Sequence, residues 1–470
     1  MHRSSWSNIL TRLASIFLLA GCGLESKLSS DGADSYQPPI DANLLVISID
    51  TTRADHLGCY GHANAQSPVL DELAQSGARF LDSFTVMPTT LPAHTALFTS
   101  QYPRQTGVQS NLGNVSPHEL TLAEQLQKHG IKTASFNSSR VLAASTGINQ
   151  GFDTYACANK NLWPADKTMG MAANWIRENK DSRFFCFVHV YDPHAGYDAP
   201  PKHKKALGVQ ATTSLPPWGQ MAFMSEPEGL SQELVEDAAR AYDAEIAFVD
   251  EQVGILLQTL KDQGVTDDTI VVVTSDHGET LHELKDTYQY AYDHGEFLYP
   301  RELRVPLLIH APSAFGFPPG QEISDAVSLL DLMPTALELM GVPCPDQIEG
   351  RSLVPALQGK ALDPAIIVAE RHSYESAPNP WMQGDAYAVI SAPWLLLASH
   401  GRGIELFRLD KDRQGLHDLA KKHGEEVKRL QRRLAQWLSS RTLNDHSLAP
   451  ESTGSERDQG LSGLGYTQGG

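Results

Sequence analysis

The sequence predicts an α/β fold, in which a sheet is covered by helices, and two observations support this class. Short apolar runs rich in β-branched residues lie at 44–49, 184–190, 269–274 and 305–309. Their continuous apolarity is typical of strands that are buried on both faces of a sheet. Helical patterns separate these runs, among them 120–129 and the long stretch 234–263. Strands that alternate with helices in this way predict an α/β sandwich.

A smaller region at the C-terminal end predicts an α+β subdomain. Strand-like runs lie at 366–369, 388–390 and 394–397, and an amphipathic helical pattern follows over 424–439. The stretch after residue 442 is rich in Gly, Ser and charge, which is typical of a loose tail. We therefore expect a main domain over 42–360, the subdomain over 361–442 and the tail over 443–470.

Composition excludes two classes of protein. The chain has 470 residues, of which 41% are hydrophobic, so there is enough apolar material for a core and the chain is not mainly disordered. Its 37 Lys and Arg stand against 56 Asp and Glu, which gives a net charge of −19. A nucleic-acid binder needs a basic surface, and this balance argues against one. An anionic small substrate stays open, because a local site can oppose the overall field.

The first 21 residues predict an export signal. Arg3 and Arg12 form a short basic head, and the apolar run over 13–20 is too short to span a bilayer as a helix. The run ends in Leu-Ala-Gly-Cys22, which resembles the cleavage box of a bacterial lipoprotein. Lipidation of Cys22 would anchor the chain to a membrane through a flexible tether over 22–41. We therefore expect an exported lipoprotein that faces the periplasm or the cell exterior, with an ordinary secretory signal as the alternative.

Cysteine usage gives no disulfide framework. Five cysteines in a chain of this length are too few for a disulfide-stabilised scaffold. Four remain besides the lipidated Cys22, namely Cys59, Cys157, Cys186 and Cys344. They allow at most two disulfides, and the sequence leaves their pairing open, as it does the oligomeric state.

Acidic residues follow three of the predicted strands. Asp50 follows 44–49, Asp192 follows 184–190, and Asp276 follows 269–274 with His277 beside it. In open α/β sheets, ligands bind at the carboxyl ends of the strands. Carboxylates and imidazoles that converge there suit a divalent cation. The sequence therefore predicts a metal site, although each acid alone would also serve as a turn or cap residue.

A hydroxyl between the first two acids is a candidate nucleophile. Thr90 lies two residues before Pro92, which is well placed in the first turn of a helix. Free backbone N–H groups and the helix dipole favour an anion at such an end. A hydroxyl ionised by a metal there is able to attack sulfur or phosphorus. The alternative is that Thr90 merely caps the helix.

These residues resemble the sulfatase family within the alkaline phosphatase superfamily. The matching segments cover nearly all of the chain after the tether: 43–61, 67–80, 151–155, 189–194, 274–279, 294–299, 303–307, 331–335, 350–353 and 464–466. The resemblance implies a large mixed, mostly parallel sheet between helices. It also makes 42–360 a catalytic domain for an anionic ester substrate.

The resemblance also implies roles for individual residues. Asp50, Asp276 and His277 would hold one divalent metal, calcium in the family pattern with zinc and manganese as alternatives, and Thr90 would touch it. His194 and His294 would contact the anionic head of the substrate, and one of them would protonate the leaving group. His94 and Arg53 would also bind substrate, although Arg53 has the alternative of pairing with Asp55. A second metal at Asp192, His194 and His294 is the less favoured arrangement.

The nucleophile segment departs from the family pattern. Sulfatases usually carry Cys or Ser followed by x-Pro-Ser-Arg, and that Cys or Ser is oxidised to formylglycine. Here the segment reads Thr90-Leu-Pro-Ala-His94, and oxidation of a threonine would give a ketone and no aldehyde. Thr51 stands where many members have a second metal-binding Asp. The Thr-x-Pro-x-His pattern instead resembles phosphodiesterase-type members of the superfamily, in which threonine attacks directly.

Three hypotheses for function follow. The first is a metal-dependent hydrolase of aryl or glycan sulfate esters with Thr90 as nucleophile, which the overall resemblance favours. The second is a phosphodiesterase or phosphonate monoester hydrolase, which the nucleophile segment favours. The third is a non-catalytic binding lipoprotein, against which the full set of site residues argues.

Overall fold

The computed structural model describes residues 36–210, 230–372 and 383–444. The predicted signal, Cys22 and the tail beyond residue 444 lie outside these ranges. All elements named below belong to the unit that begins at Pro38. Within the described residues, no helix combines the length and the apolarity that a membrane span requires.

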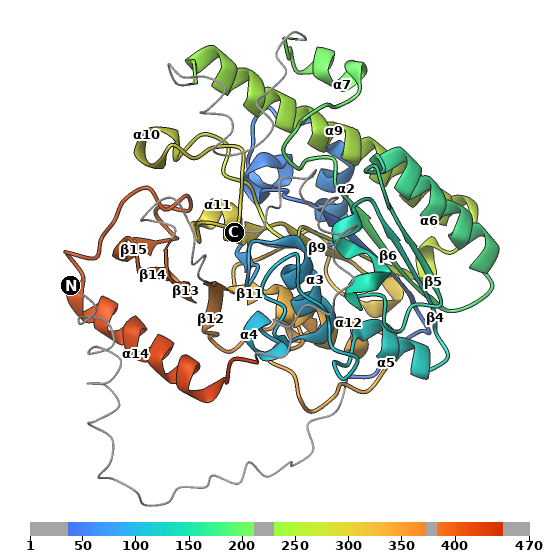
Figure 1. Ribbon diagram of the computed structural model, residues 1–470. Helices are drawn as coiled ribbons and strands as arrows, with labels where there is room; N and C mark the ends of the chain where they lie inside the picture. Colours follow the sequence, from blue (N-terminus) through green and yellow to red (C-terminus); the bar gives the residue numbers. More distant parts are fainter. Residues whose placement is uncertain (1–35, 211–229, 373–382, 445–470) are drawn as a thin grey trace, which may run out of the picture. The chain divides into compact units, whose positions relative to one another are not determined.

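An eight-stranded sheet forms the centre of this unit (Figure 1). Its strands, in spatial order, are β10 (Gln321–Ile323), β2 (Ala78–Phe80), β9 (Leu307–His310), β7 (Thr269–Thr274), β1 (Asn43–Ile49), β6 (Phe184–Val190), β4 (Lys132–Asn137) and β5 (Thr154–Cys157). Only β9 runs against its neighbours in this sheet. The predicted mixed, mostly parallel sheet is therefore confirmed.

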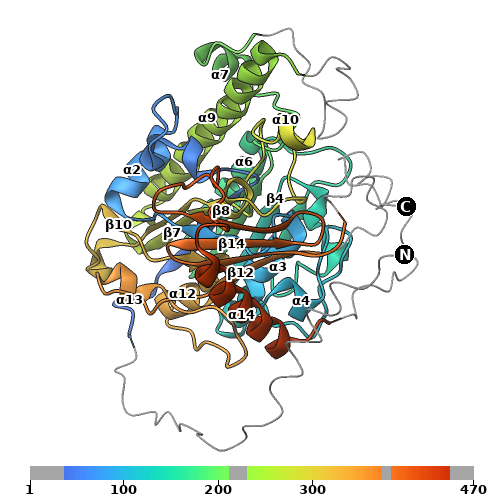
Figure 2. The ribbon, with the colours of Figure 1, turned by 90° about the vertical axis from the view of Figure 1, so that its left-hand side faces the viewer.

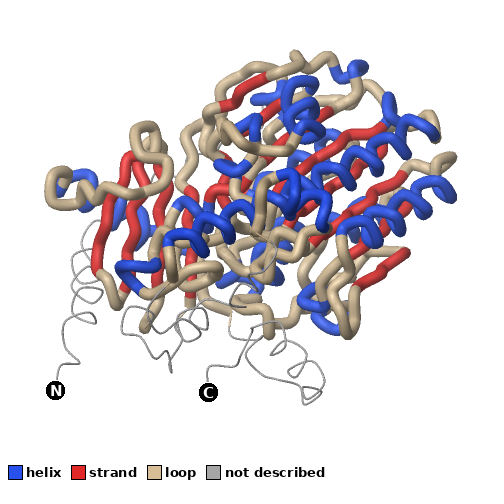
Figure 3. The backbone as a smooth tube through the Cα atoms, turned by 90° about the horizontal axis from the view of Figure 1, so that it is seen from above, coloured by secondary structure: helices blue, strands red, loops and turns tan. Residues whose placement is uncertain are grey.

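Helices cover both faces of this sheet, and the alternation of side chains along the strands explains how (Figures 1 and 3). Leu45 and Ile47 of β1 share a core with helices α2 (Pro68–Ser76), α6 (Ala165–Asn179) and α9 (Gln232–Asp262). Val46 points to the opposite face, towards α3 (Thr90–Thr99), α5 (Leu122–Lys128) and α12 (Leu332–Leu339). Strands with apolar side chains on both faces need such double cover. The helices predicted over 120–129 and 234–263 are α5 and α9.

One predicted strand is wrong in detail. The run 305–309 forms two short strands, β8 (Arg304–Val305) and β9, which lie in different sheets. Pro306 separates them, because proline has no N–H to donate to a ladder. β8 joins β3 (Ser83–Phe84) and β11 (Val327–Ser328) in a three-stranded sheet, whereas β9 lies in the central one.

A four-stranded antiparallel sheet forms the C-terminal subdomain (Figure 2). Its strands are β12 (Ile367–Arg371), β13 (Ala386–Ser391), β14 (Trp394–Ser399) and β15 (Gly403–Arg408). Helix α14 (Gly424–Ser440) packs on it through Leu430, Leu434 and Trp437. The α+β character is as predicted, but β15 was not expected, because glycine and charged residues interrupt the three apolar residues of its run 403–408.

Short helices connect these elements. They are α4 (Pro103–Thr106), α7 (Pro201–Ala206), α10 (Lys285–Tyr288), α11 (Pro300–Leu303), α13 (Val354–Leu357), η1 (Ala54–His56), η2 (Gly58–Tyr60), η3 (Arg140–Leu142), η4 (Ala144–Thr146), η5 (Thr266–Asp268), η6 (Ser313–Phe315) and η7 (Leu329–Asp331). Cys59, Cys157, Cys186 and Cys344 are all free thiols, so none of the disulfides left open above is formed among them.

Candidate active site and metal centre

The register of three neighbouring strands brings the predicted site together. Ser48 of β1 lies opposite His189 of β6 on one side and opposite Thr274 of β7 on the other. The three strands therefore end at one edge of the sheet. Asp50 and Asp276, which follow β1 and β7, meet there although 226 residues separate them in the chain.

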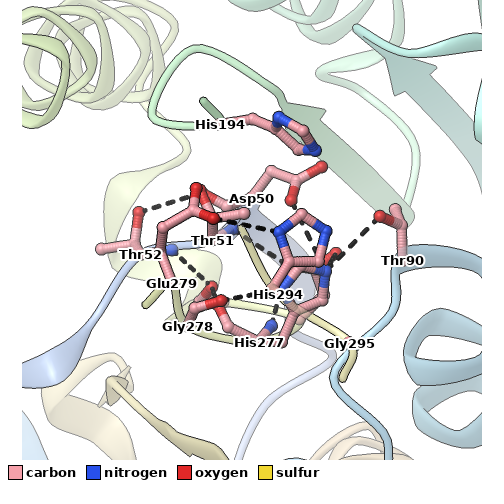
Figure 4. A network of polar contacts seen from close by, with 12 residues as sticks. Asp50, Thr51, Thr52, Thr90, His194, His277, Gly278, Glu279, His294 and Gly295 are labelled. Atoms are coloured by element: carbon pink, nitrogen blue, oxygen red, sulfur yellow. Dashed lines mark hydrogen bonds and ion pairs between the residues drawn. The ribbon is translucent and has the colours of Figure 1, made fainter. Parts of the chain in front are cut away.

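Asp50, Asp276 and His277 form a tight, fully buried group. Figure 4 labels Asp50 and His277. His277 Nε2 lies 3.8 Å from Asp50 Oδ1 and 3.4 Å from Asp276 Oδ2. His277 Nδ1 lies 3.0 Å from the carbonyl oxygen of Gly278, which only accepts hydrogen bonds, so this nitrogen carries the proton. In the neutral ring, the lone pair on Nε2 therefore faces the two carboxylates.

The charges in this group fit a cation. Asp50 Oδ1 and Asp276 Oδ2 are buried and have no hydrogen-bond partner among the described atoms. Burial, together with the charge of Asp276, raises the pKa of Asp50 well above its ordinary value. Two unpartnered carboxylate oxygens and one imidazole lone pair that face each other provide the donor set of a divalent metal. Asp50, Asp276 and His277, the predicted ligands, are the residues that would hold it.

Thr90 lies beside this group, as Figure 4 shows. It is the first residue of α3, a helix whose ten residues are all buried. Thr90 Oγ1 is 3.5 Å from His277 Nε2, the same nitrogen that faces the carboxylates. Thr89 is the N-cap and its side chain makes no cap hydrogen bond, so Thr90 is not the cap residue. The hydroxyl is thus placed within reach of the candidate metal ligands.

His194 and His294 approach the same region from two loops. Their rings lie 4.8 Å apart, edge to face, and the ring of His294 is 4.3 Å from that of His277. His194 also stacks on Tyr191 at 4.2 Å. Burial lowers the pKa of His294 to about 4 and the pKa of His194 well below its ordinary value. Both imidazoles are therefore neutral near pH 7 in the free protein, and each carries one N–H donor.

Two side chains that sequence reasoning did not single out support this site. His189 Nε2 lies 3.1 Å from Asp50 Oδ2, and Glu279 Oε1 lies 3.1 Å from His294 Nδ1. His189 thus orients Asp50, and Glu279 orients His294, in the way that outer-shell partners orient the ligands of metal sites. Both lie inside the quoted motifs, but a strand residue such as His189 shows no signal in the sequence that separates it from the core.

Asp192, the third acid at a strand end, does not join the group. Its Oδ1 accepts a hydrogen bond from the backbone N–H of Ala165, the first residue of α6, at 3.0 Å. A carboxylate at the start of a helix satisfies a free N–H there. For Asp192 the capping alternative describes the structure, and a second metal at Asp192, His194 and His294 is not among the ligand groups that the described residues form.

The structure places His94, a predicted substrate contact, behind the nucleophile. His94 is fully buried on α3, and its Nδ1 lies 2.7 Å from the carbonyl oxygen of Thr90. Because a carbonyl accepts, Nδ1 donates, and Nε2 accepts from the hydroxyl of Ser48 at 3.0 Å. Both ring nitrogens are therefore engaged inside the protein, and His94 connects the first turn of α3 to β1.

Replacement of His94 by alanine tests this placement. We expect His94→Ala to lower the free energy of unfolding by about 3 kcal/mol, because it leaves a cavity and two buried polar groups without partners. Ser48→Ala, which removes one hydrogen bond and little volume, should cost about 1 kcal/mol. Urea unfolding measures both. An unchanged stability together with a raised KM would instead make His94 a substrate ligand.

Arg53 follows its alternative prediction and pairs with Asp55. Its Nη2 lies 2.9 Å from Asp55 Oδ2, and its Nη1 contacts Glu283 and the carbonyl of Glu279. Although burial opposes ionisation of Glu283, the charge of Arg53 holds the pKa of Glu283 at about 2. The guanidinium is thus used in ion pairs, which leaves the predicted substrate contact without support in the structure.

We expect Arg53→Ala to be strongly destabilising. The substitution would leave the partly buried carboxylates of Glu283 and Asp55 without their cation and would open a cavity at a buried side chain, so we expect a loss of about 3 kcal/mol. Arg53→Lys, which keeps a charge without the planar fork, should cost less. Thermal unfolding of both variants measures the effect. A raised KM at unchanged stability would restore the role in substrate binding.

Comparisons with known proteins agree with this geometry. A family model described as Sulfatase matches residues 42–342, and one described as N-sulphoglucosamine sulphohydrolase, C-terminal, matches residues 289–442. Arylsulfatase K of Bos taurus is 24% identical over 455 residues, which cover 84% of this chain and 81% of the relative. An ulvan-active sulfatase of Formosa agariphila is 28% identical over 351 residues, which cover 68% of this chain and 66% of the relative.

Solved structures share the fold. The phosphonate monoester hydrolase of Agrobacterium radiobacter superposes with a TM-score of 0.72 at 20% identity, covering 85% of this chain and 96% of that chain. A protein crystallised with its substrate D-glucosamine-2-N,6-O-disulfate superposes with a TM-score of 0.69 at 20% identity, covering 85% of this chain and 98% of that chain. The family match spans the sheet, Thr90, Asp276 and His294. The chain therefore belongs to the sulfatase family of sulfuric ester hydrolases.

Proposed function

We propose that this protein is a metal-dependent hydrolase of sulfate esters that uses Thr90 as its nucleophile. One observation carries the proposal: the Thr90 hydroxyl, Asp50 Oδ1 and Asp276 Oδ2 all lie within 3.8 Å of Nε2 of His277. A divalent cation bound by Asp50, Asp276 and His277 would lower the pKa of the Thr90 hydroxyl and polarise the ester oxygens.

In the first step, Thr90 Oγ1 attacks the sulfur of the ester. The Oγ1–S bond forms as the bond from sulfur to the alkoxy oxygen breaks, and the proton of Thr90 passes to water. The negative charge of the bound ester favours the protonated form of one imidazole of the pair His194 and His294, and this imidazolium gives its proton to the departing oxygen, which leaves as the alcohol. N–H groups of the same pair bind the anionic head, where charge develops.

In the second step, water releases the sulfate. A sulfated threonine has no carbonyl-type hydrate that eliminates sulfate, as formylglycine has, so its ester bond must be hydrolysed directly. Water attacks sulfur, the Oγ1–S bond breaks, and Thr90 recovers a proton from the medium. The imidazole that protonated the alcohol is protonated again by the proton that Thr90 released in the first step, so one water is consumed for each ester.

A phosphodiester or phosphonate monoester is the second candidate substrate. Transfer through a threonine ester, with the charge on the oxygens stabilised, suits phosphorus as well as sulfur. The fold of this chain is also similar to that of a phosphonate monoester hydrolase, which is compatible with this candidate. At 20% identity, the similarity concerns the fold alone.

Parallel assays separate the candidates. Purified protein is supplied with an aryl sulfate, a glycan sulfate, an aryl phosphodiester and an aryl phosphonate monoester, each with calcium, zinc or manganese. We expect the highest kcat/KM on a sulfate ester. A dominant rate on the phosphorus esters would replace the proposal by the second candidate. No turnover of any ester by metal-loaded protein would leave the non-catalytic binding role.

We also propose that the protein is an exported lipoprotein held to a membrane through Cys22. The support is the sequence alone, with its basic head, short apolar run and Leu-Ala-Gly-Cys22 box. Expression of the full chain in a bacterium, followed by fractionation and mass spectrometry of the N-terminal peptide, tests it. We expect a lipidated Cys22 at the new N-terminus, and Cys22→Ala should leave the protein unanchored. An unmodified Cys22 in wild-type protein would overturn the proposal.

A further inference from the structure

A second group of metal-ligating side chains lies outside the candidate active site. His56 at the end of η1, His62 six residues later and Asp243 on α9 bring their ligand atoms within 4.8 Å of one another. None of these three residues belongs to the candidate catalytic group of Asp50, Asp276 and His277. We infer that His56, His62 and Asp243 form a binding site for a borderline divalent cation of the zinc class.

The geometry of the group supports the inference. His56 Nδ1 lies 2.6 Å from Asp243 Oδ1, and His62 Nε2 lies 3.2 Å from Asp243 Oδ2. The two rings stack with centroids 5.0 Å apart at an angle of 26°, so both nitrogens face the same carboxylate. Ligands of a tetrahedral zinc lie roughly 3.3 Å from each other, given bond lengths near 2.0–2.2 Å. The contact of His62 with Asp243 Oδ2 already has this spacing, whereas the contact of His56 with Asp243 Oδ1 must lengthen from 2.6 Å by about 0.7 Å, which a small rotation of the side chains allows.

The chemistry of the donors selects the cation. Two imidazole nitrogens and one carboxylate suit zinc, cobalt, nickel or copper, whereas calcium and magnesium prefer oxygen ligands alone. The candidate catalytic group, with two carboxylates and one imidazole, is the harder set. The same protein would therefore hold two cations with different preferences.

Partial exposure makes the group accessible. The side chains of His56, His62 and Asp243 retain 12%, 25% and 12% of their surface exposed, whereas the candidate catalytic ligands are fully buried. Three protein ligands near the surface leave a fourth position for water, so an ion can enter without unfolding of the chain.

The position of the group connects it to the segment that follows Asp50. Tyr242, next to Asp243 on α9, donates its hydroxyl to the carbonyl of Thr51 at 2.8 Å and accepts from the N–H of Arg53 at 2.9 Å. An ion bound by His56, His62 and Asp243 would add a second connection between this loop and α9, next to the one that Tyr242 makes. We therefore assign it a structural role, in which it holds the loop after β1 against α9.

Zinc titration of the full chain tests the inference. Metal-free protein is titrated with zinc in competition with a chromophoric chelator, and bound equivalents are counted for wild type, His62→Gln, His56→Gln and Asp276→Asn. We expect both His→Gln variants to bind one equivalent fewer than wild type, and Asp276→Asn to keep the equivalent that they lose. Circular dichroism confirms that each variant is folded. Glutamine keeps a hydrogen-bond donor to Asp243, so the fold should survive.

Spectroscopy and a matched control distinguish this site from adsorption to surface histidines. Copper bound to Asp276→Asn should show electron paramagnetic resonance coupling to two nitrogens, and copper bound to the double variant Asp276→Asn/His62→Gln should not. His129→Gln, which alters an exposed histidine whose ring is hydrogen-bonded to the carbonyl of Gln125, should bind as wild type does. Equal zinc stoichiometry in wild type and both His→Gln variants would overturn the inference, as would an equal loss in His129→Gln.

Discussion

Replacing Thr90 by alanine is expected to reduce turnover of the preferred ester by about 10³-fold or more while the protein stays folded. The oxygen that forms the bond to sulfur would be gone, and the lone pair of its neighbour His277 is assigned to the metal, so no replacement nucleophile is left in the site. Thr90 Oγ1 makes only a long contact, 3.5 Å to His277, so its loss should cost less than about 1 kcal/mol of stability. Asp50, Asp276 and His277 are unchanged, so metal content should stay at the wild-type level.

The matched control is Thr90→Ser, which keeps the hydroxyl and removes only the methyl group. We expect this variant to retain measurable turnover, which would show that the loss in alanine is chemical. When wild-type protein turns over a slow substrate and the reaction is quenched, the sulfate group should be found on the peptide that contains residue 90. Mass spectrometry of that peptide measures it. Wild-type rates in Thr90→Ala would refute the nucleophile assignment.

Removal of the metal is expected to have the second large effect. Chelation should abolish turnover, and adding back the correct cation should restore it. The bound ion should also raise the free energy of unfolding by about 3 kcal/mol at concentrations well above its Kd, because it binds the folded chain only. Without the ion, Asp50 and Asp276 are two carboxylates buried side by side, and this arrangement raises the pKa of Asp50.

A change of sign in one variant makes this prediction specific. Asp276→Asn should be less stable than wild type when metal is present, because it loses a ligand. In metal-free protein the same variant should be at least as stable as wild type, because it removes one of two buried like charges. Asp192→Asn, which alters the acid that caps α6, should lower stability equally with and without metal. Thermal unfolding of wild type and of both variants, once with chelator and once with metal, measures these differences. If the stability difference of Asp276→Asn keeps the same sign in both conditions, this result argues against a cation at Asp50 and Asp276.

The parts of the site that the sequence predicts well are those that depend on chain position along a strand. Asp50 and Asp276 follow continuous apolar runs, and parallel pairing places such ends together whatever else the fold does. Thr90 was predictable for a similar reason, because Pro92 marks the first turn of α3. Periodicity also predicts α9 and α14 nearly to the residue.

The sequence does not predict side-chain contacts that depend on how distant parts of the chain pack together. His94 and Arg53 have residue types that suit an anion, but each is used by buried partners that lie far away in the chain, Ser48 and Glu283. His189 looks like any strand residue until its ring is seen beside Asp50. The division of 305–309 into β8 and β9 depends on which sheet each half joins, and the apolar pattern of the run does not encode that choice.

The central place of β1 in the eight-stranded sheet has a consequence for the order in which the chain folds. β1 is the first strand to be synthesised, yet its neighbours come much later: Phe184 contacts Asn43 across 141 residues and Thr269 contacts it across 226. Pairings at such separation are slow to form, because a long loop must close before any contact repays its entropy. The apolar run 44–49 must therefore wait for β6 at 184–190 for its first partner strand, and for β7 at 269–274, more than half of the chain, for its second. A newly made chain is thus open to aggregation for that interval, and chaperones that shield early strands should raise its yield.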